Sequence, residues 1–536
     1  MPASRAYRSL RFVSEQLLIM HTTRVTGNVV FVLLITSLVE AYNILVLTPI
    51  TSPSHTAVFK SLVTELVERG HFVTYWNGLQ SDKLSTTDVN STMNNPRLRL
   101  LTSPRLAQIN SQHEIGYNDR DSPFRLLFRI PGTVSKYCKI VYEDPVFHQL
   151  MNSEEHYDLI IVDGFANDCT LYLAEVLDVP FIYLNCFPPS PWILYAIGSP
   201  LATEQFPNPS GIRDRMNFWQ RAFNTVTSVF AVYFHRRVVL PLIEDVAIKT
   251  LGINNLTSIA EIENRYLSLL LINTHFSINY QLPTSPAVIE VGGMHLNRRH
   301  QRLSEDLLSF LDDSGDAGFI VVSFGSMLRG DDVPDHFCQI FLSTFARLSQ
   351  RVIWKWEDKR KLEHQQQPIP SNVKTMPWLP QQELLAVYHS VPAIFLPISS
   401  DQPINAQKAE DDGYAIRINW DDLTEEDLYN AIQRILNISR YKEKVKEMSA
   451  LMRDQVVNPM DQAIYWIEYV VRHQGAPHLR GASRDLLLPQ RALVDVFLFL
   501  LVISLFMAYV TFRVCHFCIR TLFRKRVVTD VRKKVN

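Results

Sequence analysis

The chain has 536 residues, more than the roughly 100–200 residues of one ordinary domain, and this length predicts two domains with additional segments. Hydrophobic residues make up 47% of the chain and charged residues 20%, which is typical of a globular protein. The formal net charge is −1, so the composition indicates no basic surface for nucleic acid and gives that class of function no support.

The first apolar run lies near the N-terminus. Residues Val29–Val39 follow Arg24 and precede small residues around Ala41. This layout is typical of a signal peptide, whose apolar part spans ~7–15 residues, and the run is too short to cross ~30 Å of hydrocarbon as an anchor. We therefore expect a signal peptide over residues 1–41, with Met20 as an alternative start.

A second apolar run, Ala492–Phe512, is long enough to span a membrane, and many Lys and Arg residues follow it. Positive residues stay on the cytosolic side, which predicts a single-pass type I protein with residues 42–491 in the lumen and a basic cytosolic tail over residues 513–536. A buried core helix is the alternative. Lys533 and Lys534 are similar to the dilysine retrieval signal of endoplasmic reticulum membrane proteins, and a generic basic membrane-surface tail is the alternative.

Cysteines and glycosylation sequons are interpreted from this topology. Disulfides are possible for the lumenal cysteines, although the sequence does not determine their pairing: Cys138, Cys169, Cys186 and Cys338. Cys515 and Cys518 form a CxxC pair with no second pair and no histidine at zinc-finger spacing, which favours palmitoylation over a zinc site. Asn90, Asn255 and Asn437 begin sequons that lumenal exposure makes usable for N-glycosylation.

Strands and helices alternate in two parts of the lumenal segment. A strand at Asn43–Thr48 precedes a helix that starts near Thr56, and a strand at Gly318–Phe324 precedes a second apolar helix. This order predicts an α/β fold with parallel sheets, in which ligands bind beyond the carboxyl ends of strands. We expect two Rossmann-like domains facing a cleft, over residues 42–285 and 286–485.

Two residues at such strand ends are candidates for acid–base chemistry. His55 follows the first strand at the start of a helix, where neutral imidazole is favoured and suits a base near pH 7. Asp163 ends the apolar strand that contains Leu159, and a carboxylate there would fix the histidine tautomer. Asp168 is the second candidate for this orienting acid.

Motifs in the C-terminal half are more specific. Trp378-Leu379-Pro380-Gln381 and the run from Asp401 to Ala406 resemble the donor-binding signature of the UDP-glycosyltransferases. The run Ser323–Ser326 and the residues around His55 also fit this family. The resemblance covers nearly the whole chain, and it implies a GT-B fold in which the N-terminal domain binds the acceptor and the C-terminal domain binds the UDP-sugar.

The resemblance also implies a reaction. His55 would deprotonate a hydroxyl of a small lipophilic acceptor, with Asp163 orienting it, and a hexosyl group would move from UDP-glucose or UDP-glucuronic acid with inversion. No metal and no cofactor beyond the UDP-sugar co-substrate would be needed. Such an enzyme would serve in detoxification, and association with itself or with related enzymes stays open.

For the donor, the resemblance implies a set of contacts in the C-terminal domain. Trp378 would stack on uracil, with Gln381 as a hydrogen-bonding neighbour. Ser326 would meet the phosphates. Asp401 and Gln402 would bind the hydroxyls of the sugar.

The chain departs from the family pattern between Ala386 and Val387. About twenty residues are absent there, including a glycine-rich turn that would hold the diphosphate at a helix N-terminus. An interior strand of the second domain is lost with them, which makes the activity of this chain doubtful. Two explanations are open: a skipped exon or gene-model error, and a true isoform with a crippled donor site. The alternative function is a non-catalytic membrane protein that binds lipophilic ligands or intact partner enzymes.

Overall fold

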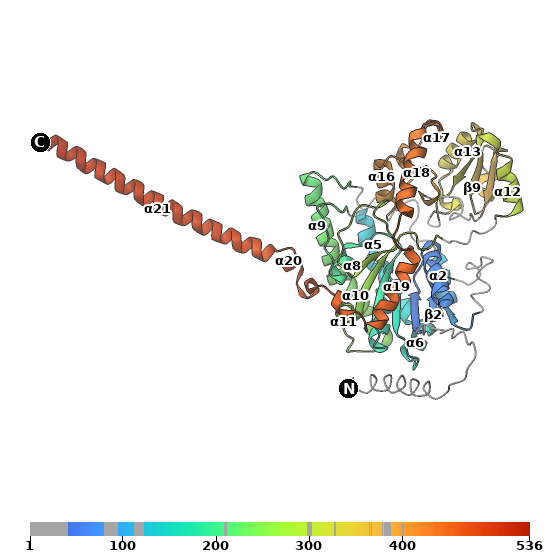
Figure 1. Cartoon of the computed structure of the whole chain (residues 1–536), viewed down its shortest axis with the longest axis horizontal. Helices are drawn as coiled ribbons and strands as arrows, with labels where there is room; N and C mark the ends of the chain where they lie inside the picture. Colours follow the sequence, from blue (N-terminus) through green and yellow to red (C-terminus); the bar gives the residue numbers. More distant parts are fainter. Residues whose placement is uncertain are drawn as a thin grey trace, which may run out of the picture. The chain divides into compact units, whose positions relative to one another are not determined.

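The computed structural model describes most of the chain between residues 41 and 535 (Figure 1). The described ranges are 41–79, 95–111, 123–207, 212–296, 303–325, 328–357, 359–363, 365, 367–377, 379, 387–398 and 401–535, with backbone only for 123–129, 331, 359 and 522–535. The predicted signal peptide, Asn90, Ser326, Trp378 and Gln381 lie outside these ranges, as do the side chains of Lys533 and Lys534.

The N-terminal α/β region is built on a seven-stranded parallel sheet with the order β3-β2-β1-β4-β5-β6-β7. Its strands are β1 (Asn43–Thr48), β2 (Phe72–Asn77), β3 (Leu98–Thr102), β4 (Leu159–Asp163), β5 (Phe181–Asn185), β6 (Leu267–Ile272) and β7 (Val288–Glu290). Every residue of β4, β5 and β6 is buried, which is typical of parallel strands covered on both faces.

Helices cover both faces of this sheet. Because side chains alternate along a strand, Leu45 and Leu47 of β1 belong to one core, and Ile44 and Val46 belong to the other. The second core contains the apolar face of α2 (Pro53–Glu68). The other helices of this region are α4 (Pro104–Ser111), α5 (Pro123–Tyr142), α6 (Pro145–Met151), α7 (Tyr172–Val176), α8 (Pro191–Ile197), α9 (Phe218–Phe234), α10 (Leu240–Leu251) and α11 (Ile259–Tyr266).

The helix α19 (Pro459–Arg472) returns from the C-terminal part of the sequence to this same sheet. Ile464 and Ile467 are buried in the core beside α2, and Arg69, which follows α2, pairs with Asp461. The boundary predicted between residues 285 and 286 also precedes β7, which pairs with β6. The N-terminal sheet therefore gathers residues from both sides of the predicted boundary.

The C-terminal α/β region has two separate small sheets. One is three-stranded and parallel, with the order β10-β9-β8, and the other pairs β11 with β12 in parallel. The strands are β8 (Phe319–Val322), β9 (Arg351–Lys355), β10 (Val373–Met376), β11 (Ala393–Phe395) and β12 (Ala415–Arg417). The helices are α12 (Glu305–Asp312), α13 (Asp335–Ala346), α14 (Lys359–Glu363), α16 (Gln402–Asp411), α17 (Glu425–Asn437) and α18 (Ser439–Arg453).

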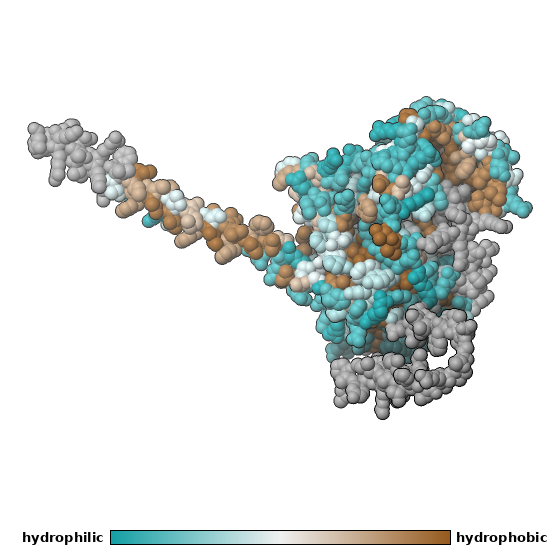
Figure 2. Space-filling view, in the orientation of Figure 1, coloured by the Kyte–Doolittle hydropathy of each residue, from teal (hydrophilic) through white to brown (hydrophobic). Residues whose placement is uncertain are grey.

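One hydrophobic core nevertheless joins the two small sheets. Phe324, just after β8, contacts Trp420, just after β12, with ring centroids 5.4 Å apart, and the Trp420 indole donates to the carbonyl of Leu396 at 3.3 Å. Phe319 on β8 is 43% exposed and Phe395 on β11 is 36% exposed. Hydrophobic surface is visible on this region in Figure 2.

Among the described residues, no strand pairs with the outer edge of β8 or with the second edge of β11. Interior parallel strands are normally paired on both edges and shielded on both faces. The division of the sheet agrees with the loss of one interior strand expected from the sequence.

The helix α21 (Val494–Val535) follows the short helix α20 (Leu488–Arg491) and includes a candidate membrane span, Val494–Thr521, with a mean hydropathy of 2.3 and none of its apolar window buried (Figures 1 and 2). The predicted span of residues 492–512 overlaps it. A second stretch, Phe218–Leu251, is also long and apolar enough, with 33% of its window buried. In its first helix, α9, the buried residues include the polar Asn224 and Ser228.

Candidate active site

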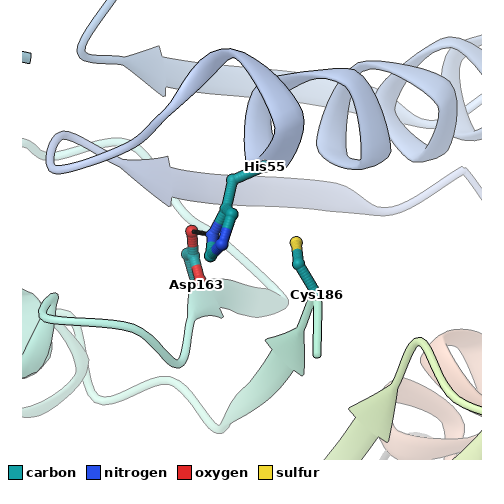
Figure 3. Close-up of side chains that lie close together, drawn as sticks. All are labelled: His55, Asp163 and Cys186. Carbon is teal, nitrogen blue, oxygen red and sulfur yellow. Dashed lines mark hydrogen bonds and ion pairs between the residues drawn. The ribbon is translucent and has the colours of Figure 1, made fainter. Parts of the chain in front are cut away.

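His55 lies in the first turn of α2, at the carboxyl end of β1 (Figure 3). Ser52 caps the helix by accepting a hydrogen bond from the backbone N–H of His55 at 3.4 Å, and Pro53 occupies the first turn, where its missing N–H costs nothing. The helix start therefore fixes the backbone from which the imidazole projects.

Two side-chain amides, one buried and one partly buried, hold the loop in front of this helix. The side chain of Asn167 donates to the carbonyl of Ile50 at 2.9 Å and accepts from its N–H at 3.0 Å. Asn110 donates to the carbonyls of Pro49 and Gly78 at 2.8 and 2.9 Å. No sequence pattern marks either residue, because an amide that binds loop backbone has no characteristic spacing from other residues in the sequence.

Asp163, the last residue of β4, is fully buried and faces His55 (Figure 3). Its Oδ2 lies 2.6 Å from His55 Nδ1, and its Oδ1 accepts from the backbone N–H of Phe165 at 3.1 Å. With both oxygens engaged, the carboxylate has a fixed orientation. The imidazole also interacts with the thiol of Cys186. A histidine whose Nδ1 is held by a buried carboxylate has the arrangement of a base with an orienting acid.

Cys186 is a third member of this cluster that the sequence did not indicate. It follows β5, and one ligand atom from each of His55, Asp163 and Cys186 lies within 4.8 Å of the other two. Figure 3 shows the thiol beside the imidazole. Burial raises the pKa of the Cys186 thiol, and the neighbouring His55 only partly offsets this effect.

Two aromatic rings flank the imidazole. The ring centroids of Phe165 and Phe187 lie 5.7 and 5.6 Å from that of His55, and the two phenylalanines contact each other edge to face. Phe165 is 43% exposed although it is a large apolar residue. An exposed aromatic side chain beside a buried polar pair offers a contact surface for an apolar molecule.

The charge balance of His55 differs from the expectation based on its helix position. Burial lowers the pKa of His55, but Asp163 and Cys186 outweigh burial and raise it well above its usual value. A helix N-terminus alone favours neutral imidazole. The buried carboxylate is the stronger influence because it lies in direct contact with the ring.

Asp168, the second candidate for the orienting acid, lies elsewhere. Its Oδ1 is 3.6 Å from Nε2 of His235, at the join between α9 and α10, and the ring of His235 stacks on Trp192. Asp163 is therefore the carboxylate that contacts His55.

Asp401 and Gln402 lie at the start of α16, and their side chains form hydrogen bonds with nearby residues of the same region. Asp401 Oδ2 accepts from Asn405 at 2.6 Å, and Gln402 accepts from the backbone N–H of Ile398 at 2.9 Å. Burial raises the pKa of Asp401. The other predicted donor contacts lie outside the described residues. Asn255 and Asn437, which begin sequons, are both exposed.

Comparison with solved structures defines the class of protein. The crystal structure of CalG4, the calicheamicin glycosyltransferase, matches with a TM-score of 0.52 and 15% identity, over 81% of this chain and 99% of that chain. Glycosyltransferase VinC in complex with dTDP matches with a TM-score of 0.51 and 13% identity, over 80% of this chain and 100% of that chain. At this identity the likeness shows the fold alone, and it is the GT-B fold of glycosyltransferases.

Sequence comparisons define the family. The family model described as "UDP-glucoronosyl and UDP-glucosyl transferase" matches residues 43–387 and 384–528. UDP-glycosyltransferase UGT5 of Dactylopius coccus is 30% identical over 499 residues, which cover 87% of this chain and 90% of that protein. UDP-glucuronosyltransferase 2B7 of Homo sapiens is 28% identical over 512 residues, covering 88% and 92%. The chain therefore belongs to the family of UDP-glucuronosyl and UDP-glucosyl transferases.

The family match is interrupted at the place where the sheet is divided. Its two segments meet at residues 384–387, and this interval contains the junction between Ala386 and Val387. Along the sequence, this interval falls between Met376, where β10 ends, and Ala393, where β11 begins.

Proposed function

We propose that this protein transfers a hexosyl group from a UDP-sugar to a hydroxyl of a small lipophilic acceptor, with His55 as the general base. The observation that carries the proposal is the 2.6 Å contact between His55 Nδ1 and the buried Asp163. Family membership indicates the class of reaction, and the buried His55–Asp163 pair supplies a base for the acceptor hydroxyl.

In the proposed step, the acceptor hydroxyl gives its proton to Nε2 of His55 while its oxygen attacks the anomeric carbon. The bond from that carbon to the diphosphate breaks, and UDP leaves with the electron pair, so the configuration inverts. Asp163 holds the Nδ1 proton and stabilises the imidazolium that forms. No metal ion takes part in this step.

The acceptor class follows from the residues around the base. Phe165 and Phe187 present aromatic faces beside His55, which favours an acceptor whose hydroxyl is attached to an apolar body. The choice between glucose and glucuronic acid as the transferred sugar is left open.

The test is transfer from UDP-glucose and UDP-glucuronic acid to a panel of phenols and sterols by the full-length protein in detergent micelles. Removing a positioned general base costs about 10²–10⁴-fold in rate, so His55→Ala is expected to lose nearly all product formation. His156→Ala, at an exposed histidine, is the matched control. Equal rates for His55→Ala and for the unsubstituted protein would refute the proposed base.

A second candidate function is favoured by the divided sheet. Without the interior strand and the phosphate loop, the C-terminal α/β region has fewer backbone N–H groups for a diphosphate, and the chain would bind lipophilic ligands without transferring sugar. Absence of UDP binding at about millimolar concentration, together with retained binding of a lipophilic phenol, would favour this candidate.

We also propose that the apolar part of α21 anchors the protein in the endoplasmic reticulum membrane, with the α/β regions in the lumen. The exposed apolar span of Val494–Thr521 and the basic residues after it support this orientation. Cleavage of sugars from Asn255 and Asn437 by endoglycosidase H would test it, because those sequons acquire glycans only in the lumen.

A further inference from the structure

Three side chains with different donor atoms converge beside the proposed base. His55 comes from α2, Asp163 from the end of β4, and Cys186 from the residue after β5 (Figure 3). One nitrogen, one oxygen and one sulfur lie within 4.8 Å of one another. Among the described residues, this is the group of His, Cys, Asp and Glu side chains whose ligand atoms lie close enough together to hold a metal ion.

The donor set matches the preferences of a particular class of cation. Thiolate and imidazole are ligands for Zn²⁺ and similar soft or borderline divalent ions, with bonds of about 2.0–2.3 Å, and catalytic-type zinc sites use three protein ligands with an open fourth position. Such bonds place the ligand atoms about 3.5 Å apart. Separations in the cluster that approach 4.8 Å therefore need to shorten by roughly 1 Å, whereas His55 Nδ1 and Asp163 Oδ2, now 2.6 Å apart, need to separate by about 1 Å if both bind the ion. Small side-chain rotations at three independent residues can supply these changes.

The surroundings of the cluster suit a bound cation. Asp163 is fully buried and His55 nearly so, which limits competition from water. A carboxylate and a deprotonated thiol together offset the double charge of the ion. A single cysteine does not make a metal site. Here two other types of ligand, both fixed by the fold, lie within reach of the Cys186 sulfur.

We propose that His55, Asp163 and Cys186 form a binding site for Zn²⁺ or a similar soft divalent cation, and that the bound cation blocks the base. On binding, the cation takes an imidazole nitrogen and a carboxylate oxygen as ligands, and the proton shared by His55 and Asp163 and the thiol proton leave to solvent. An acceptor hydroxyl can then no longer be deprotonated there. The cation is an inhibitor in this proposal, not a cofactor.

Cation binding is measured without donor or acceptor, so its outcome is independent of the proposed sugar transfer. The probe is Cd²⁺, because cadmium bound to a thiolate gives a charge-transfer band in the ultraviolet, with Zn²⁺ as the competitor. The protein is the full-length chain in detergent micelles carrying Cys515→Ser and Cys518→Ser. These two cysteines are exposed on α21 on either side of His516 and would bind cadmium themselves.

We expect one Cd²⁺ per chain with a thiolate band that Zn²⁺ displaces. Adding Cys186→Ser should abolish the band. Asp163→Asn removes a direct ligand and should weaken binding by more than the roughly 10–100-fold that is lost when a group merely supporting a ligand is removed. Cys338→Ser, at a buried cysteine in the core of the C-terminal α/β region, is the matched control and should leave the band unchanged. Equal unfolding midpoints for Cys186→Ser and its parent exclude misfolding as the cause of the loss.

Two outcomes would overturn the proposal. One is a band that survives Cys186→Ser, which would show that the cation binds at another thiol, such as the buried pair Cys138 and Cys169. The other is the absence of any band in the parent protein at micromolar Cd²⁺.

Discussion

At the scale of single residues, the site is governed by one buried carboxylate. Asp163 fixes the ring of His55 through Nδ1 and also raises its pKa, so the same contact orients the base and makes it more basic. A base with a raised pKa holds its proton to higher pH, and it accepts a proton more readily once it is neutral. Both effects on His55, the proton that is held more strongly and the more basic neutral ring, originate in its contact with Asp163.

The pH dependence of stability follows from the raised pKa of His55. Its unfolded pKa is about 6.5, and its folded pKa is higher, so the stabilisation from the pair is fully present below about pH 6.5 and is lost as pH rises through the folded pKa. Urea unfolding at a series of pH values should therefore show a stability advantage of the unsubstituted protein over His55→Gln that shrinks as pH rises. Asp163→Asn is the control, in which this pH dependence should disappear. An advantage that grows with pH would contradict the assignment.

The loop in front of His55 gives a second prediction at this scale. Asn167→Ala leaves the N–H and carbonyl of Ile50 without their buried partner, which should cost about 1–3 kcal/mol of unfolding free energy. Denaturant unfolding measures this, with Asn264→Ala at an exposed position within α11 as the control, expected within about 0.5 kcal/mol of the parent. A loss for Asn167→Ala no larger than that of the control would show that the loop does not depend on this amide.

At the scale of elements, the two halves of the fold differ in completeness. In the N-terminal sheet, β4 is paired on both edges and buried along its whole length. In the C-terminal α/β region, β8 and β11 each have an edge without a partner among the described residues, and apolar side chains are exposed on both. A strand with an open edge exchanges its amide hydrogens more readily and is prone to pair with other chains.

Hydrogen exchange tests this difference between strands. Amides of β8 (Phe319–Val322) should exchange faster than those of β4 (Leu159–Asp163) under native conditions, because no strand in the described part of the chain pairs with the outer edge of β8. Mass spectrometry of peptides covering each strand measures both in one sample. Equal protection of the two strands would mean that another segment covers the open edge of β8.

Several features of the fold and site could be predicted from the sequence. The apolar strand before Asp163 and the strand before His55 placed both residues at carboxyl ends, and adjacent parallel strands bring such ends together. The gap after Ala386 predicted the loss of an interior strand, and removing a strand from the middle of a sheet opens two edges, as in the divided sheet of the C-terminal α/β region.

Other features had no signal in the sequence. A single thiol after β5 has no spacing that relates it to His55, so Cys186 could not be assigned to the site. The periodicity of α19 shows that one face is buried but not which sheet covers it, and Ile464 and Ile467 pack on the N-terminal sheet. Asn167 binds loop backbone, which any buried amide can do.

At the scale of the whole molecule, the region proposed to bind the acceptor has a complete sheet, and the region proposed to bind the donor does not. The N-terminal sheet is continuous and holds a formed His–Asp pair, whereas the C-terminal α/β region is divided where the family match is interrupted. We therefore expect acceptor binding to be retained and UDP binding to be weak, with a dissociation constant of about 1 mM. Calorimetric titration of the full-length protein with UDP measures this dissociation constant. A nanomolar constant would contradict the expectation that loss of the phosphate loop weakens UDP binding.

The central claim is that His55, held by Asp163, serves as the base for sugar transfer. Single-turnover transfer at saturating UDP-sugar tests it most directly, because saturation removes the effect of weak donor binding. The account predicts product formation that falls about 10²–10⁴-fold in His55→Ala while UDP binding is unchanged. Product formed at the same rate by His55→Ala, or no product from the unsubstituted protein despite bound UDP, would contradict it.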